Sequence, residues 1–267
     1  MKIFDCVTFF EENRQIDLRF NILNNYVDYF IVCEGKYDHQ GKKKKINFNK
    51  NKYPKFKKKI SHIIVDKFPN NLNPWQRQAF QRETILNNIN QAEDDDLILF
   101  SDPDEIPNLS KLKKMNFKKK YIIFLQDLFY YKLNIKEVSF GNNWEGTRGC
   151  LKKNLKSIDY MRHKVIKKNL KYGFWRIDKE RNLQIIKNGG WHFSYLLTPI
   201  EIQRKIKTFA HTELNKNKFT SLSNINNCIK NFKDLFHRKS KFEKVKIDQK
   251  YPYYILKNRK KLSNWIV

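Results

Sequence analysis

The sequence predicts an α/β protein with a mostly parallel central sheet, helices flanking the sheet and a helical C-terminal region. Short, nearly continuous apolar segments of strand length recur through the first hundred residues. Such segments are typical of strands buried on both faces of a parallel sheet. Segments with helical spacing of apolar residues separate them, and this alternation predicts helices packed against the sheet.

The first hundred residues supply most of the predicted sheet. Strands are expected at residues 3–9, 28–34, 60–65 and 96–100, and helices at residues 13–23 and 74–90. Asn73 and Pro74 are the expected N-cap and first residue of the second helix. The polar connection over residues 36–58 is unusually long for a compact domain, which favours a functional role for it.

The C-terminal elements are less regular. Strands are expected at residues 121–134, 171–177 and 189–197, and a glycine-flanked loop at 141–149. Thr198 is expected to cap a helix, and a further helix is expected over residues 225–236. We expect residues 1–240 to form one domain, with the basic and aromatic tail 241–267 packed on its surface.

The composition limits the class of protein. A chain of 267 residues with 40% hydrophobic residues can bury a substantial core. The four cysteines are far apart in the sequence, which predicts buried free thiols. No segment approaches the roughly 20 apolar residues of a membrane span, and the N-terminus lacks the apolar region of a signal peptide. We therefore expect a cytoplasmic protein, peripheral at most at the inner face of the membrane.

The net charge of +28 has two interpretations. It is either the footprint of an anionic partner, such as nucleic acid or a membrane surface, or the result of a lysine-rich composition with solvated side chains. The lysines occur in runs between apolar segments and far outnumber the arginines, which favours the second interpretation. A weak attraction to membrane phosphates is compatible with both.

The acidic segment Asp102-Pro103-Asp104-Glu105 directly follows the predicted strand at 96–100. Ligands of open parallel sheets bind outside the carboxyl ends of the strands. Clustered carboxylates repel one another unless a cation or protons neutralise them, and their oxygens suit Mg²⁺ or Mn²⁺. The segment predicts a metal–diphosphate site, with a surface turn before a helix as the alternative.

His192 lies in the segment Gly189-Gly190-Trp191-His192-Phe193-Ser194. Two glycines permit a close approach of the backbone to a neighbouring segment. A neutral imidazole is a good metal ligand. By itself such a histidine is more often a packed core residue, but together with a distant Asp-x-Asp segment it becomes a candidate ligand.

Several segments in order along residues 3–215 resemble glycosyltransferase family 17, a family of β-1,4-mannosyl-glycoprotein 4-β-N-acetylglucosaminyltransferase-like enzymes. They are Phe-Phe-Glu-Glu-Asn at 9–13 before Asp-Leu-Arg at 17–19, the run at 27–35, Trp75 with Gln81 and Arg82, Ser-Asp-Pro-Asp-Glu-Ile-Pro at 101–107, Gly-Trp-His-Phe-Ser at 190–194 and Lys-Thr-Phe-Ala-His-Thr-Glu at 207–213.

The resemblance implies a GT-A-like fold over residues 1–240 and an inverting, metal-dependent transfer. It implies UDP-N-acetylglucosamine as the donor and Mn²⁺ as the cofactor, with Mg²⁺ as an alternative. The acceptor is expected to be a glycan or a lipid-linked sugar rather than a mannosyl glycoprotein, because the sequence shows no anchor or signal segment.

Site residues follow from the segments and the predicted sheet. Asp104 and His192 are the expected metal ligands, and Asp102 is expected to bind the ribose or a metal-bound water. The remaining donor-binding candidates are Glu11, Glu34, Gln81 and Arg82.

An inverting transfer also needs a general base beside the acceptor hydroxyl. Glu145 is the first candidate because Trp144 next to it suits stacking on a sugar ring, and Asp127 and Glu213 are the other two. A loop carboxylate paired with Arg148 is the structural alternative for Glu145.

Two other classes of protein compete with this interpretation. A basic nucleic-acid-binding protein would use the lysine runs and aromatic residues for phosphate contacts and stacking. A metal-dependent phosphodiesterase or nucleotidyltransferase would also use paired aspartates. The first of these leaves residues 101–107 and 189–194 without a role, so no specific nucleic acid is expected as a partner.

Overall fold

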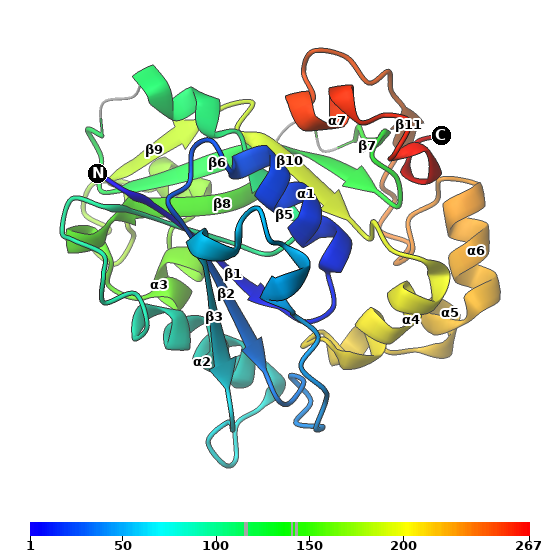
Figure 1. The fold of residues 1–267 in the computed structure, drawn as a ribbon, viewed down its shortest axis with the longest axis horizontal. Coiled ribbons are helices and arrows are strands. Elements are labelled where there is room, and N and C mark those ends of the chain that lie inside the picture. Colours follow the sequence, from blue (N-terminus) through cyan, green and yellow to red (C-terminus); the bar gives the residue numbers. More distant parts are fainter. Residues whose placement is uncertain (115–116, 140, 142–143) are drawn as a thin grey trace.

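The computed structural model describes residues 1–114, 117–139, 141 and 144–267. Its N-terminal part is a parallel sheet in the order β3-β2-β1-β4 (Figure 1). The strands are β1 (Ile3–Phe9), β2 (Tyr29–Gly35), β3 (Ile60–Val65) and β4 (Leu97–Ser101). The predicted α/β class and these four strands are confirmed.

Two helices cover opposite faces of this parallel block. Apolar residues of α1 (Asn13–Leu23) pack with Val7 and Phe9 on one face, and Ile85 of α2 (Pro74–Leu86) packs with Phe4 and Cys6 on the other. The faces differ because successive side chains of a strand point in opposite directions. Asn73 is the N-cap of α2 and Pro74 its first residue, as the sequence predicts, and Gln76 completes a capping box; the helix ends at Leu86 rather than near residue 90.

The sheet continues beyond β4 with mixed strand directions. Strand β8 (Trp144–Leu151) is antiparallel to both β4 and β6 (Tyr121–Tyr130). Strand β10 (Gly190–Ser194) is parallel to β6 and antiparallel to β5 (Glu105–Pro107). The remaining strands at this end are β7 (Ile135–Glu137), β9 (Leu183–Ile186) and β11 (Phe242–Lys244).

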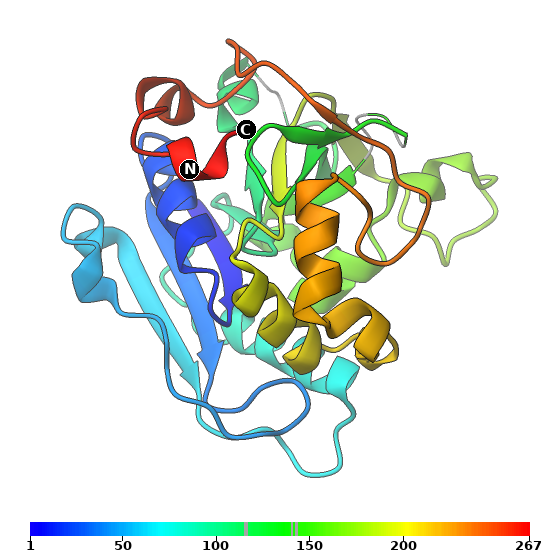
Figure 2. The same ribbon diagram turned by 90° about the vertical axis from the view of Figure 1, so that its right-hand side faces the viewer.

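The C-terminal region adds a helical layer and closes over the sheet (Figure 2). Helices α4 (Pro199–Thr208), α5 (Asn217–Thr220) and α6 (Leu222–Lys230) share a third apolar cluster. In the tail, β11 pairs with β7, and Ile255 of α7 (Tyr253–Lys257) is buried in the same core cluster as α1. The other helices are α3 (Ile158–His163) and the 3₁₀ segments Lys50–Lys52, Lys57–Lys59, Leu109–Lys114, Lys152–Asn154, Lys167–Lys171, Thr212–Leu214 and Ser263–Trp265.

Three expectations for the C-terminal half are wrong. Most of the expected loop 141–149 is strand β8, in which Gly146 packs against the side chain of Gln126; residues 142 and 143 lie outside the described residues. Residues 171–177 form an exposed loop rather than a strand. Helix α6 ends at Lys230, and Phe232 with a φ of +50° reverses the chain direction.

All four cysteines are buried and free, as the sequence predicts. Within the described residues, no helix combines the length and the apolar character that crossing a bilayer requires.

Candidate active site

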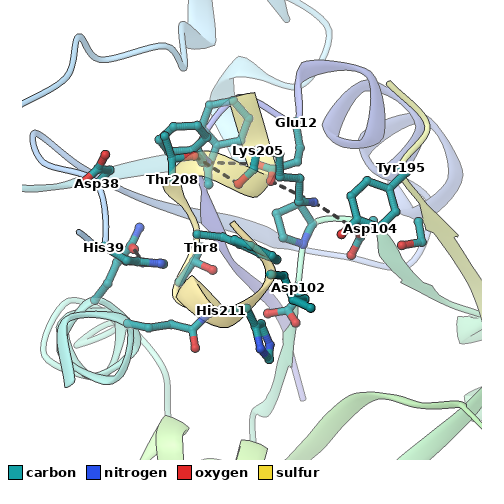
Figure 3. Close-up of a pocket in the computed structure, with 18 of the residues that line it drawn as sticks. Thr8, Glu12, Asp38, His39, Asp102, Asp104, Tyr195, Lys205, Thr208 and His211 are labelled. Carbon is teal, nitrogen blue, oxygen red and sulfur yellow. Dashed lines mark hydrogen bonds and ion pairs between the residues drawn. The ribbon is translucent and has the colours of Figure 1, made fainter. Parts of the chain in front are cut away.

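A cavity of about 270 Å³ lies at the carboxyl ends of the parallel strands (Figure 3). Thr8 comes from β1, Gly35 from the end of β2, and Asp102 from the turn after β4. The long connection after β2 contributes Asp38 and His39 to the cavity lining, which agrees with the functional role expected for this connection. Helix α4 and the segment after it close the opposite wall with Lys205, Thr208, Phe209, His211 and Leu214.

Strand pairing brings the acidic segment and His192 together. Immediately after the turn at Asp102, the three-residue strand β5 pairs with β10 and places Glu105 opposite His192. The carbonyl of Asp104 accepts a hydrogen bond of 2.8 Å from the backbone N–H of Phe193. Gly190 permits this approach, because a Cβ there would lie 2.2 Å from the Ile106 carbonyl oxygen and its φ is +142°. The glycines before His192 therefore serve the close approach expected from the sequence.

The carboxylate of Asp104 lies between the imidazole of His192 and the ammonium group of Lys205. Its Oδ1 lies 3.3 Å from Nε2 of His192, and its Oδ2 lies 3.5 Å from Nζ of Lys205. Burial alone raises the pKa of Asp104, but Lys205 and His192 outweigh it and hold the pKa well below the ordinary value. The carboxylate is therefore ionised at neutral pH.

Lys205 and Glu12 are site residues that sequence reasoning missed. Nζ of Lys205 also lies 3.3 Å from Oε1 of Glu12, whose Oε2 accepts the backbone N–H groups of Phe10 and Glu11. Burial lowers the pKa of Lys205, but Asp104 and Glu12 raise it above its ordinary range. Nothing in the sequence separates this lysine from the many others, and only its position on the inner face of α4 could have hinted at its role.

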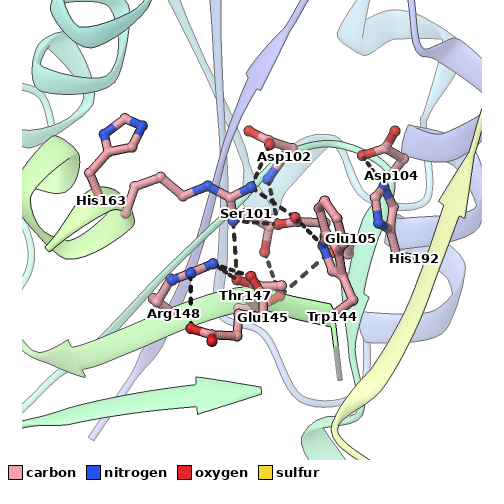
Figure 4. Close-up of polar contacts among 12 residues, drawn as sticks. Ser101, Asp102, Asp104, Glu105, Trp144, Glu145, Thr147, Arg148, His163 and His192 are labelled. Atoms are coloured by element: carbon pink, nitrogen blue, oxygen red, sulfur yellow. Dashed lines mark hydrogen bonds and ion pairs between the residues drawn. The ribbon is translucent and has the colours of Figure 1, made fainter. Parts of the chain in front are cut away.

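Asp102 and Glu105 share a second buried cation (Figure 4). The guanidinium of Arg162, from the last turn of α3, contacts both oxygens of Glu105 at 2.9 Å and Oδ2 of Asp102 at 2.7 Å. Nε1 of Trp144 donates a further hydrogen bond of 2.8 Å to Glu105. Arg162 thus links the buried carboxylate of Glu105 to the turn and fixes the direction of the Asp102 carboxylate.

Of the expected donor-binding residues, Gln81 and Asp102 line the cavity, and the other three do not. Arg82 lies beneath the turn, 3.1 Å from Asp159 and 3.9 Å from Asp102. The side chain of Gln81 connects α2 to β2 and to the connection after β2. It donates a hydrogen bond to the Cys33 carbonyl and contacts Nε2 of His39 at 2.8 Å.

Glu34 and Glu11 do not line the cavity and have other partners. Glu34 is fully buried and accepts hydrogen bonds from Lys44 and from the backbone of Asn47 and Phe48. It therefore ties the long connection to the end of β2. Glu11 pairs with Arg204 at 2.7 Å.

None of the three candidates for the general base lines the cavity. The carboxylate of Glu145 accepts the Lys167 backbone N–H at 2.8 Å and lies 3.6 Å from Arg148, which is the pairing expected under the structural alternative. Asp127 pairs with Lys136 at 3.0 Å, and the exposed Glu213 pairs with His211 at 2.8 Å. The carboxylates that do line the cavity outside the acidic turn are Glu12 and Asp38.

The residues present fit a divalent ion that takes its remaining ligands from outside the protein. Among the described residues, no three or more His, Cys, Asp or Glu side chains are grouped closely enough to hold an ion alone. Asp104 and His192 offer one carboxylate and one imidazole, and Nδ1 of His192 is buried without a hydrogen-bond partner. Ions such as Mg²⁺ are typically held by one or two protein ligands together with phosphate oxygens and water.

The fold and the site are those of an α/β enzyme whose cavity combines acidic and basic side chains at the carboxyl end of a parallel sheet. The sequence model of glycosyltransferase family 17 matches residues 1–243. The chain therefore belongs to glycosyltransferase family 17. A comparison with curated proteins found no match.

Proposed function

We propose that the protein is an inverting, metal-dependent glycosyltransferase that transfers N-acetylglucosamine or a related hexose from a UDP-sugar to a glycan hydroxyl. One observation carries the proposal: Asp102 and Asp104 line one cavity at the carboxyl end of β4 together with His192, which is distant in the sequence, in a chain of family 17. The family membership favours this over nucleic-acid binding or phosphodiester chemistry.

The donor diphosphate would bind between the acidic turn and α4. Asp104 and His192 would hold a divalent ion, Mn²⁺ in our proposal with Mg²⁺ as the alternative, which offsets the charge of the leaving diphosphate. Lys205 would supply a second positive charge from the opposite wall, because its ammonium already lies 3.5 Å from Asp104. The ribose would face Asp102, whose carboxylate Arg162 holds in place.

The reaction would be a single displacement at the anomeric carbon. The acceptor oxygen forms a bond to this carbon as the bond to the diphosphate oxygen breaks, and UDP leaves with the bonding electron pair. The acceptor proton passes to a general base. We assign this role to one of the two remaining cavity carboxylates, Glu12 or Asp38, because Glu145 does not line the cavity.

The acceptor in this proposal is a glycan or a lipid-linked sugar, handled in the cytoplasm with weak contact to an anionic membrane surface. The four free cysteines support a reducing compartment. The excess of basic residues supports attraction to an anionic surface.

Thermal unfolding with and without UDP-N-acetylglucosamine and Mn²⁺ tests the donor assignment. A ligand that binds the folded state raises the unfolding temperature. We expect stabilisation by UDP-N-acetylglucosamine plus Mn²⁺ and none by an oligonucleotide; the reverse pattern would overturn the proposal.

Release of UDP in the presence of acceptor sugars then tests the base. Glu12→Gln, Asp38→Asn and Glu145→Gln are compared for kcat and for the KM of the donor. We expect a large loss of kcat with Glu12→Gln or Asp38→Asn, and little change with Glu145→Gln. Loss of kcat in Glu145→Gln alone would return the role to Glu145.

A further inference from the structure

The loop between α3 and β9 exposes large apolar side chains. Phe174, Trp175 and Ile177 are 84%, 69% and 96% exposed, and Leu170 is also exposed. In Figure 2 this yellow-green loop projects from the body of the molecule. A soluble protein seldom exposes adjacent large apolar residues without a binding role.

Hydrogen bonds within the loop fix its conformation, and in this conformation the apolar side chains are exposed. The buried side-chain amide of Asn169 donates to the carbonyls of Lys164 and Glu180, at 2.7 and 3.0 Å, and closes the two ends of the loop. Within the tip, the N–H of Arg176 donates to the Gly173 carbonyl at 3.1 Å. These bonds hold the loop together while the apolar side chains at its tip remain exposed.

The base of the loop is fixed to the body of the protein. The Lys167 N–H donates to the Glu145 carboxylate at 2.8 Å, and Arg148 donates to the Val165 carbonyl. Val165 itself is fully buried in the core cluster that includes α2 and α3. The apolar tip is therefore presented from a rigid base.

Basic residues surround the apolar tip. Residues 164–181 contain seven lysines and arginines and two acids. One of the acids, Asp178, is paired with both Arg176 and Lys179 at 2.7 and 2.8 Å. Lys168 and Lys171 are exposed on the approach to the tip. The segment thus combines an exposed apolar and aromatic tip with flanking residues of net positive charge.

We propose that residues 164–181 form a membrane-docking loop, in which Phe174, Trp175 and Ile177 insert into the interface of an anionic bilayer while the flanking basic residues contact lipid phosphates. Aromatic side chains favour the headgroup level of a bilayer. Each basic residue near an anionic surface adds about fivefold to the binding constant. The aliphatic side chain of Ile177 would gain little from contact with a nucleic acid, whereas it can be buried in a bilayer. The excess positive charge of the segment favours a bilayer that contains anionic lipids. Docking of this loop does not depend on the proposed activity.

Vesicle co-sedimentation of the full chain tests the loop. Wild type is compared with Phe174→Ser/Trp175→Ser/Ile177→Ser, using phosphatidylcholine vesicles with and without phosphatidylserine. We expect binding to the anionic vesicles only, and a loss of about tenfold or more in the triple variant. Ile200→Ser/Tyr253→Ser, which removes exposed apolar residues elsewhere, should bind as wild type does. Equal binding of wild type and the triple variant would overturn the proposal.

A charge-matched pair separates local docking from the overall charge of the protein. Lys168→Glu/Lys171→Glu should weaken binding far more than Lys57→Glu/Lys58→Glu, which makes the same change at another exposed site. Quenching of tryptophan fluorescence by brominated lipid should occur in wild type and be largely lost in Trp175→Phe. Equal effects of the two charge variants, or quenching that survives Trp175→Phe, would refute insertion of this loop. Concentration-dependent dimerisation that the triple variant abolishes, without vesicle binding by wild type, would assign the surface to self-association and overturn the proposal.

Discussion

Replacing Arg162 with methionine should destabilise the protein strongly. Glu105 is fully buried and contacts the Arg162 guanidinium through both carboxylate oxygens, while Arg162 is 11% exposed. Removing one partner of a buried ion pair leaves an uncompensated charge and typically costs about 3–5 kcal/mol. For a domain of this size the unfolding temperature should fall by about 10 °C.

The chain offers a matched control for this prediction. Nε and Nη2 of Arg176 also pair with a carboxylate, that of Asp178. In this pair, however, the two side chains are 42% and 51% exposed. Exposed pairs contribute about 0–1 kcal/mol, so Arg176→Met should have little effect on stability.

Urea unfolding without any ligand measures both variants. A double variant Arg162→Met/Glu105→Leu should recover part of the stability lost in Arg162→Met, because it removes the unpaired charge as well. If Arg162→Met costs no more than Arg176→Met, the assignment of Arg162 as the counter-ion of a buried carboxylate is refuted.

Three further predictions concern the cavity and the end of β2. Asp104→Ala should abolish donor turnover while Asp127→Ala, a sequence-level candidate that lies outside the cavity, should retain it; equal turnover in both would contradict the metal assignment. Lys205→Met should raise the donor KM or lower kcat by about tenfold or more, whereas Lys207→Met on the same helix should not, as steady-state kinetics would show. Burial raises the pKa of Glu34, but its hydrogen bonds outweigh this and lower the pKa. Its stabilisation is therefore present at neutral pH and lost as pH falls through the lowered pKa, so Glu34→Gln should destabilise the protein more at pH 7 than at pH 3 in urea unfolding.

Local patterns in the sequence are sufficient for the first half of the fold. The apolar segments that form β1, β2 and β4 predict buried strands, because they are short for helices and too apolar for exposed strands. The capping residues Asn73 and Thr198 fix the starts of α2 and α4, and both form capping boxes. These features depend on neighbours within a few residues, which is why the sequence alone predicts them.

The failures have a common cause in contacts between distant segments. The glycines around Gly146 indicate a loop, but this segment forms strand β8, where Gly146 packs against the side chain of Gln126 on β6. The β-rich residues around Trp175 pair with no strand among the residues that the structure describes, and they form an exposed loop. Glu145 is a candidate base in the sequence because it adjoins Trp144, yet strand alternation sends the two side chains to different surroundings.

The candidate site is only partly predictable for the same reason. Asp104 can be placed from its position after a buried strand, whereas its contact with His192 depends on the pairing of the short strand β5 with β10. Lys205 cannot be singled out, since its role arises from the approach of α4 to the acidic turn.

The arrangement of cations around the acidic turn also has a consequence for metal dependence. Arg162 pairs with Glu105 and Asp102, and Lys205 lies between Asp104 and Glu12. Part of the charge of these four carboxylates is therefore compensated within the protein itself, unlike sites in which metal binding supplies the folding energy. A chelator should stop turnover, and added Mn²⁺ should restore it, while the free energy of unfolding measured without donor stays unchanged. A large loss of stability on chelation would show instead that the turn depends on a resident ion, and that its ion pairs with Arg162 and Lys205 do not hold it in place.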